Sequence, residues 1–213
     1  NMNKVKKLVC TFLTLLFSVV ASVSAANAES RCFYVTSYAL ENEGDGLSWA
    51  SPMSLTNANA KAVNGDTIFM KAGEYVITNN IFTVSKALTI EGGYAGTDDM
   101  ALDEEKPFSV LTQKGKTLQH ICRVSATSGD VKFKRIEVTS GGVYGMVKSD
   151  ANCNLLVDTC NFVSNGFSFA EAAGKKYGKA LRVEGSTSST IIITNSYFAY
   201  NCCTDNGKNR GGP

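Results

Sequence analysis

The stretches VDTCNFVSN (Val157–Asn165) and ITNSYFAYN (Ile193–Asn201) share one pattern, in which a Phe is followed three positions later by an Asn. A third stretch, FKRIEVTSG (Phe133–Gly141), aligns with both, and the copies are offset by 24 and then 36 residues. A repeat of this length that supplies short strands and a turn is typical of a solenoid. The alignment makes two sets of positions equivalent: Val138, Phe162 and Phe198, and Gly141, Asn165 and Asn201.

This repeat predicts a parallel β-helix, in which each copy forms one coil and equivalent residues of successive coils lie about 4.8 Å apart. We expect the Phe side chains to stack inside as a ladder. We expect the Asn residues at the bend between strands, because Asn tolerates the left-handed backbone conformation and stacked amides can hydrogen-bond along the axis. Gly141 would serve at the same bend because it has no Cβ. The alternative is a chance coincidence of two common residue types.

The rest of the sequence after the first 28 residues is also dominated by short runs of Val, Ile, Phe, Tyr and Thr between Gly, Asn, Ser and Asp. Such runs are typical of strands. One segment is predicted to be a helix, because Leu55, Ala58 and Ala62 fall on one face after Pro52. We expect this helix over Met53–Val63 to cover the open end of the first coil. The predicted fold class is all-β, a parallel β-helix with an N-terminal capping helix.

The first 28 residues have the layout of a secretory signal. Three lysines precede an apolar run from Leu8 to Val20, and small residues then lead to an A-x-A site before Glu29. The run of 13 residues is shorter than the roughly 20 that a membrane-spanning helix needs. We therefore expect residues 1–28 to be a signal peptide and residues 29–213 to be an exported β-helix domain.

The charge of the exported part argues against one class of partner. When the three signal lysines are taken from the 21 basic residues, 18 remain against 19 acidic ones. This near-neutral balance gives no electrostatic basis for binding nucleic acid.

Six cysteines remain after the signal, and an exported chain permits disulfides, with fifteen pairings open. A single histidine is too few for a usual Cys/His zinc site. Cys160 lies at an expected core position, and we interpret it as a small buried apolar residue.

At the repeat residues, the sequence resembles the polymorphic outer-membrane protein repeats first described in chlamydiae, which combine Phe-x-x-Asn with Gly-Gly-Ala-(Ile/Leu/Val). Gly141-Gly142-Val143-Tyr144 is a near match to the second motif, and Gly178-Lys179-Ala180-Leu181 is a degraded one. Upstream, GDGLSWASPMSLTNANAKAVNGDTIFMKAGEY is similar to the first coil of such proteins. The resemblance covers about residues 33–213. It departs from the family in having two clean Phe-x-x-Asn copies and no full Gly-Gly-Ala-Ile.

The resemblance implies a right-handed parallel β-helix, exported and displayed at the cell surface or outer membrane, often in adhesion. We therefore expect a non-catalytic protein whose partner is a surface glycan or a host or cell-surface protein. Downstream coils or an anchoring domain of the same chain are further expected partners. Arg210-Gly211-Gly212 matches the start of another repeat, so we expect an N-terminal fragment of a longer protein. After Asn201 no segment is predicted to cap the last coil.

A carbohydrate-active β-helix enzyme, with its site in coils beyond this sequence, is the alternative. Such a site needs clustered carboxylates, often with calcium, and a basic residue. Asp98, Asp99 and Asp103 are the candidate metal ligands, and we interpret their segment as a solvated loop. Asp158 and Lys134 occupy equivalent positions one coil apart, which we interpret as a surface interaction rather than an acid/base couple. No catalytic residue and no cofactor is predicted.

Overall fold

The computed structural model describes residues 29–37, 44–78, 80–113, 120–149, 152–166, 180–184 and 188–201, and the backbone of 204–205 and 208–209. The chain divides into two units, Asn1–Ser30 and Arg31–Pro213, and the fold described below is that of the second. Within the described ranges, no helix has the length and apolar character needed to cross a bilayer.

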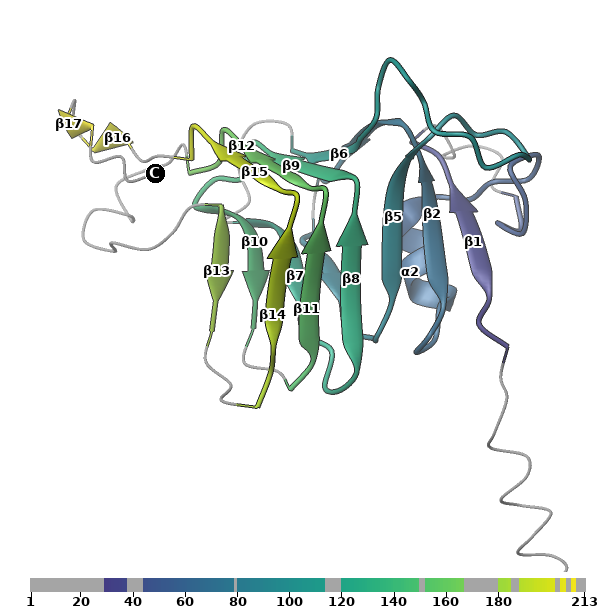
Figure 1. Cartoon of the computed structure of the whole chain (residues 1–213), viewed down its shortest axis with the longest axis horizontal. Coiled ribbons are helices and arrows are strands. Elements are labelled where there is room, and N and C mark those ends of the chain that lie inside the picture. Colours follow the sequence, from purple (N-terminus) through teal and green to yellow (C-terminus); the bar gives the residue numbers. More distant parts are fainter. Residues whose placement is uncertain are drawn as a thin grey trace, which may run out of the picture. The chain divides into compact units, whose positions relative to one another are not determined.

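Three parallel sheets form this second unit (Figure 1). Sheet A contains β1 (Cys32–Val35), β2 (Thr67–Lys71), β5 (Thr89–Tyr94), β8 (Asp130–Lys134), β11 (Asn154–Asp158) and β14 (Ile191–Thr194). Sheet B contains β3 (Gly73–Val76), β6 (Ser109–Thr112), β9 (Ile136–Thr139), β12 (Asn161–Val163) and β15 (Tyr197–Ala199). Sheet C contains β4 (Phe82–Val84), β7 (His120–Val124), β10 (Tyr144–Lys148) and β13 (Leu181–Val183).

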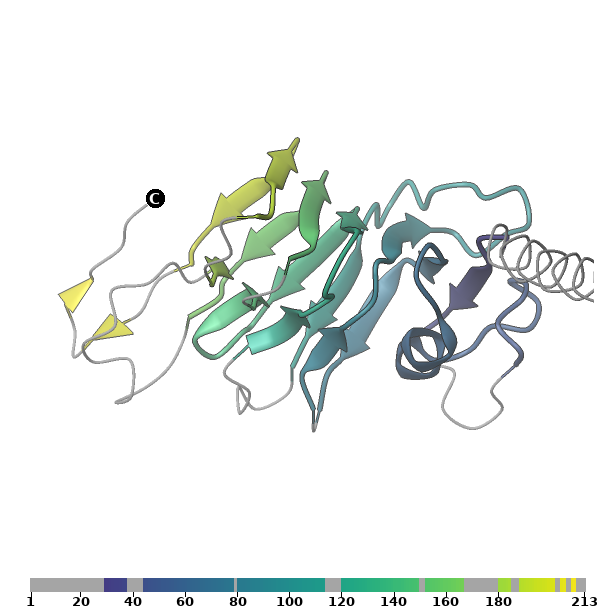
Figure 2. The ribbon, with the colours of Figure 1, turned by 90° about the horizontal axis from the view of Figure 1, so that it is seen from below.

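The chain passes repeatedly from sheet A to sheet B to sheet C (Figure 2), and each of the four complete turns adds one strand to each sheet. The first turn supplies only β1, and the last described turn supplies only β14 and β15. Every pair within the three sheets is parallel, for example β8 with β11 and β11 with β14. A short antiparallel pair follows, β16 (Thr204–Asp205) with β17 (Lys208–Asn209). Crossovers between parallel strands are right-handed. The predicted fold, a right-handed parallel β-helix, is confirmed.

The register stacks apolar residues of successive coils in the interior. In sheet B, Val138 pairs with Phe162, and Phe162 pairs with Phe198. Val138 and Phe162 are fully buried. The rings of Phe162 and Phe198 are stacked, with centroids 4.9 Å apart and planes 7° from parallel. In sheet A, a second buried ladder runs through Ile68, Ile90, Phe133 and Val157.

Asn165 links three coils at the bend after sheet B. Its Nδ2 donates to the carbonyl of Val138 at 2.9 Å, and its Oδ1 accepts from the N–H of Gly141 at 2.9 Å. On the other side, its own N–H donates to Oδ1 of Asn201 at 3.1 Å. Asn201 in turn donates from Nδ2 to the carbonyl of Phe162 at 2.7 Å. The amides therefore form a continuous chain of hydrogen bonds along the axis.

The backbone expectation for these Asn residues was wrong. The left-handed conformation belongs to the residue before each repeat position, namely Ser140 (φ 65°) before Gly141, Ser164 (φ 55°) before Asn165 and Tyr200 (φ 54°) before Asn201. Asn is instead needed for its side-chain amide. Gly141 is needed for space, because a Cβ there would lie 2.1 Å from the carbonyl oxygen of Tyr144 and 3.0 Å from Oδ1 of Asn165.

Helix α2 (Leu55–Lys61) covers the N-terminal edge of sheet C and is shorter than the predicted Met53–Val63. It begins after Ser54, whose side chain accepts from the N–H of Asn57, because Met53 is held in a bridge to Val35. It ends where Ala62 becomes extended. The side chain of Asn59 donates to the carbonyl of Thr83 on the edge strand β4 at 2.9 Å. The predicted capping helix is confirmed.

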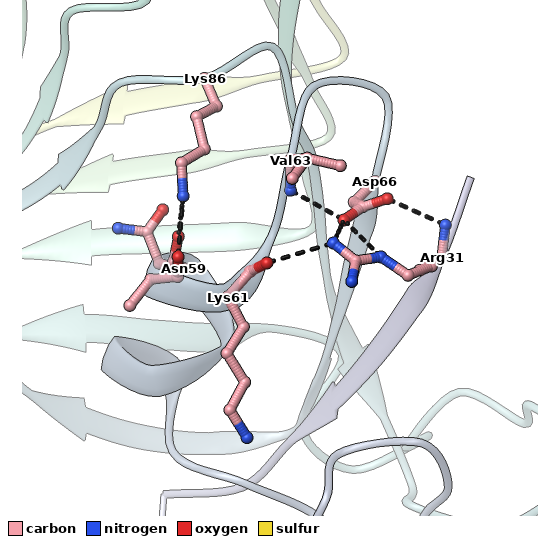
Figure 3. Close-up of polar contacts among 7 residues, drawn as sticks. Arg31, Asn59, Lys61, Val63, Asp66 and Lys86 are labelled. Atoms are coloured by element: carbon pink, nitrogen blue, oxygen red, sulfur yellow. Dashed lines mark hydrogen bonds and ion pairs between the residues drawn. The ribbon is translucent and has the colours of Figure 1, made fainter. Parts of the chain in front are cut away.

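Asp66 ties the helix to the first two strands of sheet A (Figure 3). Its carboxylate accepts from the N–H of Val63 at 2.8 Å and from the backbone and guanidinium of Arg31. Arg31 also donates to the carbonyl of Lys61, and Lys86 donates to the carbonyls of Asn59 and Ala60. These cations satisfy the carbonyls that a helix C-terminus leaves unpaired.

Truncation of the interior ladder should cost more stability at Phe162 than at Phe198. Phe162 is completely buried, so Phe162→Ala should lower the free energy of unfolding by about 3–5 kcal/mol. Phe198 is 39% exposed, and Phe198→Ala should lower it by less than half as much. Urea unfolding of both variants measures the difference. Equal losses would contradict the described stacking order.

Asp66 should make stability depend on pH at the acid end. Burial alone would raise the pKa of Asp66, but the hydrogen bonds from Val63 and Arg31 outweigh it and leave the pKa lowered. The ionised form therefore stabilises the fold above the unfolded-state pKa of about 3.9, and this contribution is lost as pH falls through the folded pKa. Asp66→Asn should cost about 1–3 kcal/mol near pH 7 and progressively less below about pH 4.

Urea unfolding at several pH values measures this effect. The matched control is Asp130→Asn, because the Asp130 carboxylate is exposed. It accepts from Nδ2 of Asn154 at 2.9 Å and pairs with Lys132 at 3.8 Å, and exposed contacts of this kind contribute little. A cost at Asp66 that does not change between pH 7 and pH 3 would contradict the assignment.

Candidate functional site

One row of outward-facing side chains crosses all six strands of sheet A, the sheet that faces the viewer in Figure 1. Side chains alternate along a strand, so the residue after each buried ladder position points outward. The strand register aligns these residues with one another. The outer row consists of Tyr34, Phe69, Glu91, Lys134, Asp158 and Thr194.

The N-terminal end of the outer row is aromatic. Tyr34 and Phe69 have ring centroids 5.6 Å apart, and Trp49 and Tyr94 pack beside them. Trp49 lies 4.9 Å from Tyr34 and 6.0 Å from Tyr94, and its Nε1 donates to the sulfur of Met100 at 3.3 Å. Tyr34, Trp49 and Phe69 are half-buried. We call these four rings the aromatic cluster.

The middle of the outer row is ionic. Glu91 accepts from Arg135 and forms a 3.2 Å ion pair with Lys134. Arg135 also donates from Nε to the carbonyl of Gly92, and its guanidinium lies 5.2 Å from the ring centre of Tyr94. Burial would raise the pKa of Glu91, but the two cations outweigh this effect and leave the pKa lowered. Burial and the charge of Glu91 raise the pKa of Tyr94 to about 12.

Asp158 continues the row toward the last strand. Its carboxylate accepts from Thr194 and from Asn195, each at 2.9 Å, and these bonds lower its pKa. Asp158 and Lys134 are register partners, as the repeat predicts. Lys134, however, forms its ion pair with Glu91, which lies on the neighbouring strand β5, and not with Asp158 on β11.

The acidic segment after β5 does not form a ligand cluster in the structure. Asp99 accepts from Thr97 and from the N–H of Ala101, and Asp103 accepts from the N–H groups of Glu105 and Lys106. Asp98 and Asp99 are exposed. Within the described ranges, no three His, Cys, Asp or Glu side chains are placed to share a metal ion.

His120 and the cysteines lie apart from the outer row. His120 is the first residue of β7 and is buried, and its Nε2 has no hydrogen-bond partner among the described residues. Burial, with smaller effects from Arg123 and Arg182, lowers its pKa to about 4. Cys160 is buried, and burial raises the pKa of its thiol to about 11. Four cysteines carry no disulfide, namely Cys32, Cys122, Cys153 and Cys160. Cys202 and Cys203 lie outside the described residues.

Tyr34, Phe69, Glu91 and Arg135 were not singled out from the sequence, although a signal for them existed. The repeat alignment began at Phe133 and was not extended to DTIFMKA and LTIEGGY, where the same alternation places Phe69 and Glu91 beside buried isoleucines. The long connection between β5 and β6 hides this equivalence, because it separates Glu91 from its partner Lys134.

The chain was also compared with known proteins. No family model matches it, and neither does any curated protein. The crystal structure of pectate lyase Pel9A matches with a TM-score of 0.48 and 16% sequence identity, over 84% of this chain and 48% of the lyase. The chain thus spans about half the length of that enzyme. So weak a likeness supports no conclusion about activity, and the resemblance to outer-membrane protein repeats stays a prediction.

Proposed function

We propose that this chain is an exported surface protein that binds a polysaccharide along the outer row of sheet A and does not cleave it. The observation that carries the proposal is the outer row itself. It spans five strand steps of about 4.8 Å, or roughly 24 Å. A row of this length suits an extended polymer better than a single small molecule.

The two ends of the row fit different parts of a sugar chain. Aromatic rings pack against apolar surfaces while neighbouring polar groups remain wet, and the aromatic cluster offers such rings at one end. Asp158 and Thr194 offer hydrogen-bonding groups at the other. Glu91 and Asp158 of the row are balanced by Lys134 of the row and by the adjacent Arg135, so this surface has no excess of either charge. This balance favours a neutral polysaccharide over a strongly anionic one.

The carboxylates of the row are poorly suited to proton transfer. An effective general base has a pKa near the working pH, whereas the pKa values of Glu91 and Asp158 are both lowered. Each carboxylate is also held by hydrogen bonds from neighbouring side chains. These features support binding rather than catalysis.

The export part of the proposal rests on residues 1–28, which lie outside the described residues. Their pattern predicts cleavage before Glu29. Mass determination of the secreted chain tests this part independently of the binding surface.

Removal of an aromatic ring from the outer row should weaken polysaccharide binding. Calorimetric titration with a neutral galactan, a xylan and anionic polygalacturonate should detect binding of a neutral polymer. Phe69→Ala should reduce that affinity by about tenfold, a loss of roughly 1.4 kcal/mol. No reducing or unsaturated ends should appear in any mixture.

The matched control is Tyr197→Ala, which removes an aromatic side chain that is 58% exposed on sheet B. It should leave the affinity unchanged. Equal losses in both variants would contradict the placement of the site. Turnover that disappears in Lys134→Ala would instead favour the carbohydrate-active enzyme.

A further inference from the structure

The last coil, β14 and β15, exposes residues that are buried in every preceding coil. Ile193 and Phe198 are 43% and 39% exposed, whereas their register partners Val157 and Phe162 are 1% and 0% exposed. Phe198 stacks on Phe162 with one face of its ring. Within the part of the chain that the structure describes, both interior ladders therefore end in a partly exposed apolar side chain.

Within the described ranges, backbone N–H groups at the bends of the last coil also lack the acceptors that their equivalents in the preceding coil have. In the preceding coil, the N–H groups of Thr159 and Ser164 donate to the carbonyls of Thr194 and Ala199 at 3.1 and 3.0 Å. Their equivalents in the last coil are Asn195 and Tyr200. Neither N–H has an acceptor among the described residues. Unpaired strand edges of this kind are templates for another strand.

Among the described residues, the chain of Asn side-chain hydrogen bonds along the axis also ends at Asn201. The N–H groups of Gly141 and Asn165 each donate to the Oδ1 of the Asn in the next coil. The N–H of Asn201 has no such acceptor in the part of the chain that the structure describes. The Nδ2 groups of Asn165 and Asn201 each donate to a carbonyl one coil back. A further Asn would find the carbonyl of Phe198 at the equivalent place.

The opposite end of the β-helix is covered at sheets A and C, so the open edge is not common to both ends. The N–H of Met53 donates to the carbonyl of Tyr34, and the N–H of Tyr34 donates to the carbonyl of Gly46, so residues 46–53 cover the edge of β1. Helix α2 covers the edge of β4. A second copy that stacked head to tail on the open edge would therefore meet covered strands at two of its three sheets.

We propose that the edge of β14 and β15 docks one further strand–bend–strand segment in parallel register, with an apolar side chain over Phe198 and an Asn beside Asn201. Such a segment supplies carbonyls for Asn195 and Tyr200 and an Oδ1 for Asn201. A second copy that met this edge with its own β14 would run antiparallel and would not place an Asn there. The geometry therefore favours a coil of the same kind over a second copy.

The test supplies such a coil to the full chain. A copy of NLLVDTCNFVSN (Asn154–Asn165) is attached to the C-terminus through a flexible Gly/Ser linker, which raises its local concentration. Hydrogen exchange then follows the amides of Asn195, Tyr200 and Asn201. We expect each to exchange about tenfold more slowly than in the unmodified chain. Amides of β7 and β10 serve as an internal reference for the intact fold.

The matched control carries Asn165→Ala within the attached copy only, and it should lose most of the slowing at Asn201. Unchanged exchange in the first fusion, or equal slowing in both, would overturn the proposal. Slow exchange of the same amides in the unmodified monomer would also overturn it, because the edge would already be covered. A dimer of the unmodified chain in light scattering, with these amides protected, would assign the edge to a second copy instead.

Discussion

The hydrogen bonds of the Asn165 side chain fix how successive coils stack. One buried amide binds Val138 and Gly141 of the preceding coil, and the neighbouring backbone N–H binds Asn201 of the next. Inside a protein, an unmade hydrogen bond to a buried polar group is costly. A stack shifted by one residue would leave several such groups unpaired, so the amide chain fixes the axial register of coils that are 24 and 36 residues apart.

That register has consequences far from the bend. It places Phe162 between Val138 and Phe198 in the interior. It also decides which side chains of sheet A point outward, because a slip of one residue exchanges the two faces of a strand. The outer row, with its aromatic and ionic parts, thus follows from interior packing. The proposed binding surface therefore follows from the same strand register that packs the interior.

The sequence alone allowed the β-helix, its repeat positions and the capping helix to be predicted, because each rests on a local pattern. Prediction from the sequence failed for features that depend on the direction in which a side chain points in the folded chain. The left-handed residues precede the Asn positions, since the amide must point along the axis. Lys134 binds Glu91 rather than its other neighbour Asp158, whose carboxylate already accepts from Thr194 and Asn195. No sequence spacing reveals that choice.

The energetic coupling between the side chains of Asn165 and Asn201 reports on the stacked register. Urea unfolding of Asn165→Ala, Asn201→Ala and the double variant gives the coupling energy of two residues that lie 36 positions apart. Because Nδ2 of Asn165 donates to Oδ1 of Asn201 at 3.0 Å, and Asn165→Ala removes this bond, we expect a coupling of about 1–3 kcal/mol. Losses that add to within about 0.3–0.5 kcal/mol would mean that the two amides do not meet, and would contradict the stacked register.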